Sequence, residues 1–146
     1  MAATPQHTYQ ILTKRSKRLA QLAGELDWPG NVWMGVSIED DRCAFRSRHL
    51  AEVDAAVRFL SLEPLLGPLS SLELADVDWV IVGGESGARA RPLDLDWVRD
   101  IRDRCVDADV AFFFKQVGGR TPKAGGRHLD GRTWDELPPR AVTAAS

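Results

Sequence analysis

Five short apolar runs, spaced at about the length of one strand–helix unit, constrain this chain more than any other feature of its sequence. Each run is rich in β-branched or aromatic residues and ends in a polar or glycine cluster, which is typical of strands. None alternates strictly between apolar and polar residues, so both faces of each strand are expected to be covered, as in a parallel sheet or barrel. The predicted strands are Thr8–Leu12, Val32–Val36, Val57–Leu60, Trp79–Val82 and Val110–Phe114.

Helix signals lie between the predicted strands. An apolar stripe over residues 19–26 follows the i, i+3, i+4, i+7 spacing of an amphipathic helix. Asp94 is placed to cap the N-terminus of a second helix, whose apolar positions lie within residues 95–105. Residues 40–54 allow a helix with a ragged apolar stripe. Residues 64–78 contain two prolines and one glycine, so a crossing that is largely loop is expected there.

This alternation of strands and helices predicts an α/β fold, either a partial (βα) barrel or an open parallel sheet of about five strands. The chain has 146 residues, whereas a complete eight-stranded barrel needs roughly 250. We expect a single α/β domain, an incomplete barrel, over residues 1–137. A flexible C-terminal tail is expected over residues 138–146. The missing strands of such a barrel would leave an exposed sheet edge.

Charge, cysteine content and hydropathy bear on which partners, metals and compartments are expected. The chain has 19 basic and 21 acidic side chains and a formal net charge of −2, so no global charge demands a polyanionic partner. Cys43 and Cys105 are far apart, and the histidines have no ligand spacing, so no metal site is expected. No apolar stretch approaches 18 residues and residues 1–7 lack the apolar core of a signal peptide, so a cytoplasmic protein without membrane contact is expected.

Polar residues follow each predicted strand. The first of them, at positions 13, 37, 61, 83 and 115, are separated by 24, 24, 22 and 32 residues, close to one strand–helix unit. In a parallel sheet these ends share one edge, which is where ligand sites of α/β folds gather. The candidate ligand-binding residues at this edge are Lys14, Arg15, Ser37, Glu39, Ser61, Glu63, Gly83, Gly84, Glu85, Ser86, Lys115 and Gln116.

The chemistry of this edge has two readings. Its carboxylates, Glu39, Glu63 and Glu85, and its ammonium groups, Lys14 and Lys115, suffice for general acid–base chemistry or for holding a charged ligand. Alternatively, they pair with one another as ordinary salt bridges. No catalytic residue is assigned among them.

Two further features bear on the ligand. The amides of the glycine turn at residues 83–87 could approach a phosphate, a carboxylate or an amino-acid-like ligand, or the glycines could serve only a tight turn. The turn fits neither the dinucleotide-binding motif nor the P-loop. The basic cluster at residues 14–18 indicates an anionic small molecule or nucleotide, unless it is a solvated face. Five arginines could extend this basic surface: Arg42, Arg46, Arg48, Arg89 and Arg91.

Six collinear motifs carry a family resemblance. They are HTYQILTKR at 7–15, NVWMGVSIE at 31–39, RFLSLEPLLG at 58–67, DWVIVGGESG at 78–87, FFFKQ at 112–116 and LDGRTWDE at 129–136. In this order they resemble the later two-thirds of a phage-associated family of uncharacterised proteins. Members of that family usually begin with three closely spaced cysteines, similar to the iron–sulfur motif of radical S-adenosylmethionine enzymes. This chain lacks that cysteine segment.

The resemblance implies an uncharacterised phage or prophage protein, the substrate-side portion of a radical-SAM-like barrel with an anionic-ligand-binding mouth. S-adenosylmethionine and an iron–sulfur cluster would require the missing cysteine-bearing segment or a partner that supplies it, because two cysteines cannot hold such a cluster. Expected partners are therefore a separately encoded cysteine-bearing segment, or a second copy bound through an exposed sheet edge. The alternative is a noncatalytic ligand- or protein-binding module, or a nonfunctional truncated remnant.

Overall fold

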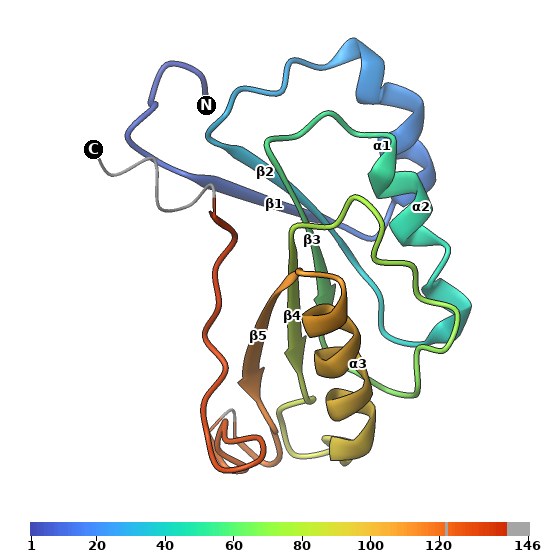
Figure 1. The fold of residues 1–146 in the computed structure, drawn as a ribbon, viewed down its shortest axis with the longest axis vertical. Helices are drawn as coiled ribbons and strands as arrows, with labels where there is room; N and C mark the ends of the chain where they lie inside the picture. Colours follow the sequence, from blue (N-terminus) through green and yellow to red (C-terminus); the bar gives the residue numbers. More distant parts are fainter. Residues whose placement is uncertain (122, 140–146) are drawn as a thin grey trace.

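The computed structural model describes residues 1–121 and 123–139, in which five parallel strands form one open sheet. The strands are hydrogen-bonded in the order in which they occur along the chain, as Figure 1 shows. The predicted α/β class and open parallel sheet are confirmed. The strands are β1 Tyr9–Thr13, β2 Val32–Ser37, β3 Val57–Leu62, β4 Trp79–Gly83 and β5 Ala111–Gln116.

Helices connect most of the strands. The described residues contain three α-helices, α1 Ser16–Leu22, α2 Arg46–Ala51 and α3 Leu95–Asp107, and two 3-10 helices, η1 Ala23–Glu25 and η2 Asp41–Cys43. Asp94 caps α3 as predicted, because its carboxylate accepts a hydrogen bond of 2.9 Å from the backbone N–H of Asp96. The segment 64–78 crosses without a helix or strand, also as predicted.

The predicted bounds were close for the strands and looser for the first helices. Each strand begins and ends within two residues of its prediction. The first helix starts at Ser16, three residues before the predicted stripe, and its last part is the 3-10 helix η1. Only the short η2 and α2 form within residues 40–54, in keeping with the ragged stripe there. Most of the tail predicted for residues 138–146 lies outside the described residues, and Pro138 is buried.

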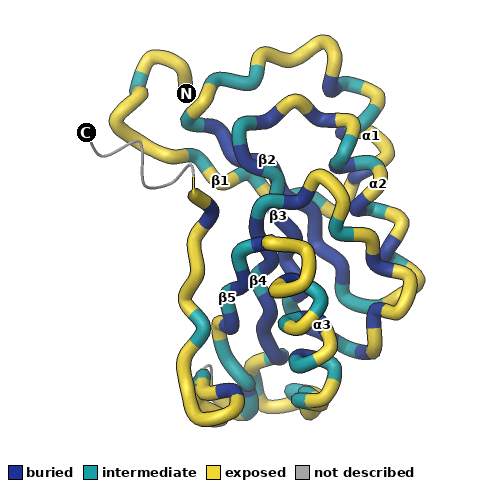
Figure 2. The backbone as a smooth tube through the Cα atoms, viewed as in Figure 1, coloured by how far each residue is buried: buried dark blue, intermediate teal, exposed yellow. Residues whose placement is uncertain are grey.

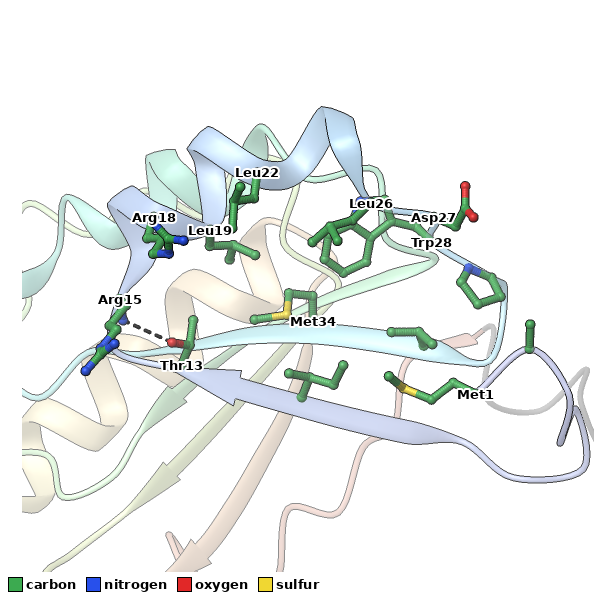
Figure 3. Close-up of a pocket in the computed structure, with 14 residues that line it drawn as sticks. Met1, Thr13, Arg15, Arg18, Leu19, Leu22, Leu26, Asp27, Trp28 and Met34 are labelled. Atoms are coloured by element: carbon green, nitrogen blue, oxygen red, sulfur yellow. Dashed lines mark hydrogen bonds between the residues drawn. The ribbon is translucent and has the colours of Figure 1, made fainter.

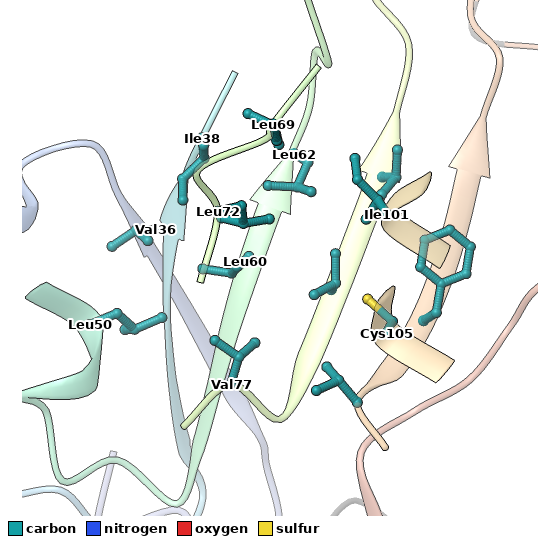
Figure 4. Close-up of a cluster of buried hydrophobic side chains, with 14 of the residues drawn as sticks. Val36, Ile38, Leu50, Leu60, Leu62, Leu69, Leu72, Val77, Ile101 and Cys105 are labelled. Carbon is teal, nitrogen blue, oxygen red and sulfur yellow. The ribbon is translucent and has the colours of Figure 1, made fainter. Parts of the chain in front are cut away.

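The two faces of the sheet are covered differently. On one face, alternate strand residues such as Val36, Leu60 and Val80 pack with residues of all three α-helices, including Leu50 and Ile101. Figure 4 shows this helix-covered core, and Figure 2 shows how deeply it is buried. We call the opposite side, on which Trp33, Val57, Phe59 and Trp79 form a separate cluster, the open face. The prediction that both faces of each strand are covered is confirmed for β2, β3 and β4, whose residues are nearly all buried. It was wrong for the outer strands β1 and β5, where exposed or half-buried residues recur.

The two outer edges of the sheet also differ. Residues 134–136 run antiparallel along β5, where the Phe114 N–H donates to the Trp134 carbonyl at 2.9 Å and the Glu136 N–H donates to the Phe112 carbonyl at 3.2 Å. Among the described strands, β1 pairs with β2 alone. The Tyr9 N–H donates to the carbonyl of Asn31, the residue before β2. Because alternate residues of a strand direct their backbone groups to opposite sides, those of Gln10 and Leu12 are directed away from β2, to the outer edge of the sheet.

Candidate functional site

Glu39, just beyond β2, is held between two cationic side chains. Lys14, which follows β1, donates to Glu39 Oε1, and Arg46 of α2 donates to Oε2 at 3.1 Å. The same Arg46 guanidinium donates to the Ser37 carbonyl at 2.6 Å. Burial by itself raises the pKa of Glu39, but the hydrogen bond from Lys14 and the charges of Lys14 and Arg46 outweigh it and lower that pKa. Glu39 is therefore an ion-paired carboxylate rather than a proton donor at neutral pH.

Glu63, just beyond β3, belongs to a second polar cluster. Lys115 of β5 donates to Glu63 Oε2 at 2.9 Å, and Gln116 approaches Oε1 at 3.4 Å. Gln116 also donates to the Gly84 carbonyl at 3.1 Å and to Ser86 Oγ at 2.8 Å. A side chain at Gly83 would meet Glu63 atoms at 3.1–3.3 Å, so this glycine leaves room for the carboxylate. The cluster thus joins residues that follow β3 and β4 with residues of β5.

Glu85 pairs with Arg91 across the glycine turn that follows β4. The guanidinium donates to both carboxylate oxygens, from Nε at 2.8 Å and from Nη2 at 3.0 Å, and the Arg91 backbone N–H donates at 3.0 Å. The side-chain hydrogen bond from Arg91 lowers the pKa of Glu85 to about 2. This pair orders the turn through its own contacts.

A basic pocket of about 350 Å³ lies beside the first of these clusters. It is lined by the cationic residues Lys14, Arg15, Lys17, Arg18 and Arg46, together with Ser16, Gln21 and Phe45. Lys14 and Arg46 share the single carboxylate of Glu39. Within the described residues, Arg15, Lys17 and Arg18 form no ion pair, and all three are exposed. The pocket therefore carries several positive charges against one negative charge.

The predicted candidates therefore separate into clusters instead of meeting in one network. Printed contacts join Lys14 with Glu39, and Glu63 with Lys115, Gln116, Gly84 and Ser86. No hydrogen bond or ion pair among the described residues links Glu39 to Glu63 or to Glu85. Two further candidates form backbone hydrogen bonds at the same edge of the sheet. The Ser61 carbonyl accepts from the Ile38 N–H, and the Gly83 carbonyl accepts from the Leu65 N–H, both at 3.0 Å.

Sequence reasoning missed a hollow on the open face, which lies next to the Glu63 cluster and has a volume of about 500 Å³. Its lining includes three of the predicted candidates, Ser61, Glu63 and Lys115, beside aromatic and aliphatic side chains that the sequence did not single out as ligand contacts. The signal that could have found it is the alternation along β3, β4 and β5, whose every second residue is directed to this face. The lining residues are Gln10, Leu12, Phe59, Ser61, Glu63, Trp79, Ile81, Phe113, Lys115 and Leu137.

A third depression, of about 590 Å³, is an apolar groove between α1 and the first two strands. Figure 3 shows Leu19, Leu22 and Trp28 above Met34, with Arg15 and Arg18 at one end. The groove adjoins β1, whose outer edge is unpaired among the described strands. An apolar surface beside a strand edge is a place where a further strand–helix unit can pack.

The two cysteines do not fit an iron–sulfur cluster. Cys105 lies on the core-facing side of α3, and its burial raises the pKa of its thiol to about 12. Cys43 belongs to η2 and is half-buried. Such clusters are held by three or four thiolates on closely placed ligands. In the part of the chain that the structure describes, no group of three or more His, Cys, Asp or Glu residues is placed to hold a metal ion.

These features define a class: a parallel α/β protein with sequentially ordered strands, helices on one face and ion-paired polar clusters at the carboxyl ends of its strands. The family described as "Protein of unknown function (DUF5131)" matches residues 1–138, and the chain belongs to this family. No curated protein matches the chain, and no solved structure does. None of the helices in the described residues has the length and apolar content that a membrane span needs.

Proposed function

We propose that this chain binds an anionic ligand in the basic pocket at the carboxyl edge of its sheet. The observation that carries the proposal is the charge of that pocket, which is lined by five cationic side chains. Two of them, Lys14 and Arg46, pair with the carboxylate of Glu39. Ligand sites of parallel α/β folds gather at this edge. A phosphate or carboxylate group would meet Arg15, Lys17 and Arg18 without having to displace a protein carboxylate from them.

The ligand we propose is a small molecule that carries one or more phosphates or carboxylates, a nucleotide among them. The pocket of about 350 Å³ has room for the charged part of such a molecule. The net charge of −2 for the whole chain argues for a local site rather than a surface for long nucleic acids. Arginine forks bind planar or tetrahedral oxyanions through paired hydrogen bonds, which favours Arg15 and Arg18 as the main contacts.

We further propose that the chain is the substrate-side portion of a larger radical-SAM-like barrel, as its resemblance to phage-associated proteins implies. Sequential strand order with all helices on one face supports this proposal, because a closed barrel is built from that same progression. The unpaired edge of β1 and its apolar groove are the proposed contact for a cysteine-bearing segment or a second copy. The free Cys43 and Cys105 fit the reducing environment of the cytoplasm, where we place the protein.

The anion site is tested by isothermal titration calorimetry with pyrophosphate at low salt. A variant carrying Arg15→Gln, Lys17→Gln and Arg18→Gln is expected to bind about tenfold more weakly or worse, because it loses the unpaired cations. Binding to the unchanged chain is expected to weaken as salt is raised, since the pocket is open to solvent.

The matched control removes three positive charges elsewhere. Arg89, Arg120 and Lys123 are exposed, and none of them lines the pocket, so changing all three to Gln is expected to leave pyrophosphate affinity unchanged. The proposal is wrong if the control weakens binding as much as the pocket variant does. Absence of pyrophosphate binding by the unchanged chain would also contradict it.

The barrel proposal has a separate test. The chain is co-expressed with the product of a neighbouring reading frame that encodes three clustered cysteines, and the pair is purified and reconstituted anaerobically with iron and sulfide. Co-purification followed by binding of S-adenosylmethionine supports the proposal. If the two products form no complex, the alternative of a noncatalytic binding module is favoured.

A further inference from the structure

The hollow on the open face combines an aromatic floor with two opposite charges at its rim. It measures about 500 Å³, within the usual range for small-molecule sites. It shares no lining residue with the basic pocket. The two are therefore separate sites, and each can be tested without the other.

The floor of the hollow is held by packing among aromatic rings. The Trp79 ring lies 5.9 Å from Phe59 and 6.1 Å from Phe113, measured between ring centroids, and it contacts Trp33 edge-on at 6.1 Å. The Trp79 indole N–H donates to the Glu136 carbonyl at 2.9 Å, which fixes the ring. Such a surface attracts aromatic or large aliphatic groups. The floor is therefore ready for an apolar side chain.

The packing of the floor depends on the absence of a side chain at Gly35. A Cβ atom at that position would stand 2.5 Å from the Phe59 ring, so only glycine lets the ring lie against β2. Gly35 and Phe59 are direct partners across β2 and β3. The glycine thus allows the Phe59 ring to take the position in which it lines the hollow.

The rim carries one carboxylate and one ammonium group that contact each other. Glu63 and Lys115 pair at 2.9 Å, and their side chains are 23% and 50% exposed. Both line the hollow. A pair this open to water contributes little to stability, so exchanging it for contacts with a ligand has a small cost.

We infer that this hollow binds a free α-amino acid with a large apolar side chain. The ammonium group of the ligand would contact Glu63, its carboxylate would contact Lys115, and its side chain would lie over Trp79 and Phe113. A purely anionic ligand would draw Lys115 away and leave the carboxylate of Glu63, whose side chain is only 23% exposed, without its cation. A purely cationic ligand would gain no contact with Lys115. A zwitterion satisfies both charges at once.

Titration calorimetry with L-phenylalanine and L-leucine tests this inference. Three probes remove one feature at a time: phenethylamine lacks the carboxylate, 3-phenylpropanoate lacks the ammonium group and glycine lacks the side chain. Each is expected to bind about tenfold more weakly or worse than L-phenylalanine, since each loses a charged contact or the apolar burial. The tryptophan fluorescence of the chain is expected to change on saturation, because the Trp79 ring forms part of the floor, and a Trp79→Phe variant should lose most of this change.

Glu63→Gln and Lys115→Gln are each expected to weaken L-phenylalanine binding about tenfold or more, while Lys123→Gln leaves it unchanged. Thermal denaturation of each variant shows whether the fold is kept, and pyrophosphate binding serves as a second check that the chain is intact. The inference is overturned if phenethylamine or 3-phenylpropanoate binds as tightly as L-phenylalanine. It is also overturned if neither amino acid binds at about 10 mM, or if both charge-removing variants bind it normally.

Discussion

The two faces of the sheet are built from alternate residues of the same strands, yet they are suited to different tasks. On the helix-covered face, Phe112 and Phe114 are fully buried among residues of α3 and the neighbouring strands. On the open face, Phe113 of the same strand is only half-buried, and Leu12 of β1 is 49% exposed. The helix-covered face is therefore the more completely buried of the two, whereas the open face combines a buried aromatic cluster with side chains that stay partly exposed.

This difference has a simple origin in strand geometry. Successive side chains of a strand point to opposite faces. A helix that packs on one face therefore does not cover the side chains of the other face. The open face is covered in part by its own aromatic cluster of Trp33, Phe59 and Trp79. The segment after β5 adds to this cover, since Arg127 lies over the Phe113 ring at 5.3 Å. A sheet with one face left uncovered by helices is unusual for parallel strands. The open face is therefore the region in which a functional reason for exposed apolar surface should be sought.

The largest expected effect compares neighbouring phenylalanines of β5. Phe112→Ala is expected to lower the free energy of unfolding by about 3–5 kcal/mol, because it leaves a cavity in the helix-covered core. Phe113→Ala is expected to cost about 1 kcal/mol, since its ring is already partly exposed to water. Urea denaturation measures both. Equal losses would show that the open face is as important for stability as the helix-covered face.

A smaller effect is expected for glycines on the open face and away from it. Gly35→Ala is expected to lower the free energy of unfolding by about 1–3 kcal/mol, because the Phe59 ring has to move. Gly24, in η1, has open space where a side chain would go, so Gly24→Ala serves as the control and should be near neutral. If Gly35→Ala is equally neutral in thermal denaturation, the packing of Phe59 against β2 is not needed for the open face.

The smallest effect on stability is expected away from both faces of the sheet, at the Glu85–Arg91 pair in the turn that follows β4. The pKa of Glu85 is about 2, below its ordinary value of 4.5, so the unfolded chain binds its proton more readily than the folded chain. The stabilisation is therefore complete above about pH 4.5 and is lost as the pH falls through about 2. In an NMR titration of the Glu85 carboxyl, Arg91→Gln should raise its midpoint toward the ordinary value, whereas Arg89→Gln should not. A midpoint near 4.5 in the unchanged chain would contradict the pairing.

Much of the fold could be predicted because the determining signals are local. Runs of apolar residues mark the strands, and Asp94 marks the start of α3. The helix after β2 could be placed only loosely, because its sequence has no clear apolar stripe and its six residues depend on tertiary contacts. Which faces the helices would cover was not predictable from continuous apolar runs, since such runs do not distinguish the two sides of a strand.

The candidate site was predicted in its parts and not in its grouping. The first polar residue after each strand marks the carboxyl edge of the sheet, and Lys14 and Glu39 meet there. The roles of Arg46 and Arg91 could not be predicted, because they depend on the paths of the connections that return their side chains to Glu39 and Glu85. The hollow on the open face was missed for the same reason, since it depends on which side of the sheet the helices leave bare.

The unequal edges of the sheet determine how copies of this chain could assemble. Residues 134–136 occupy the outer edge of β5, so β1 is the edge at which a further strand could be added. If the β1 edge of one copy paired with the β5 edge of the next, the contact would repeat without end and produce a filament. Here the β5 edge is occupied, so this contact cannot form. Pairing of β1 with β1 of another copy uses both free edges and stops at two chains. If copies do pair through their sheets, the occupied edge of β5 would therefore limit the assembly to a dimer.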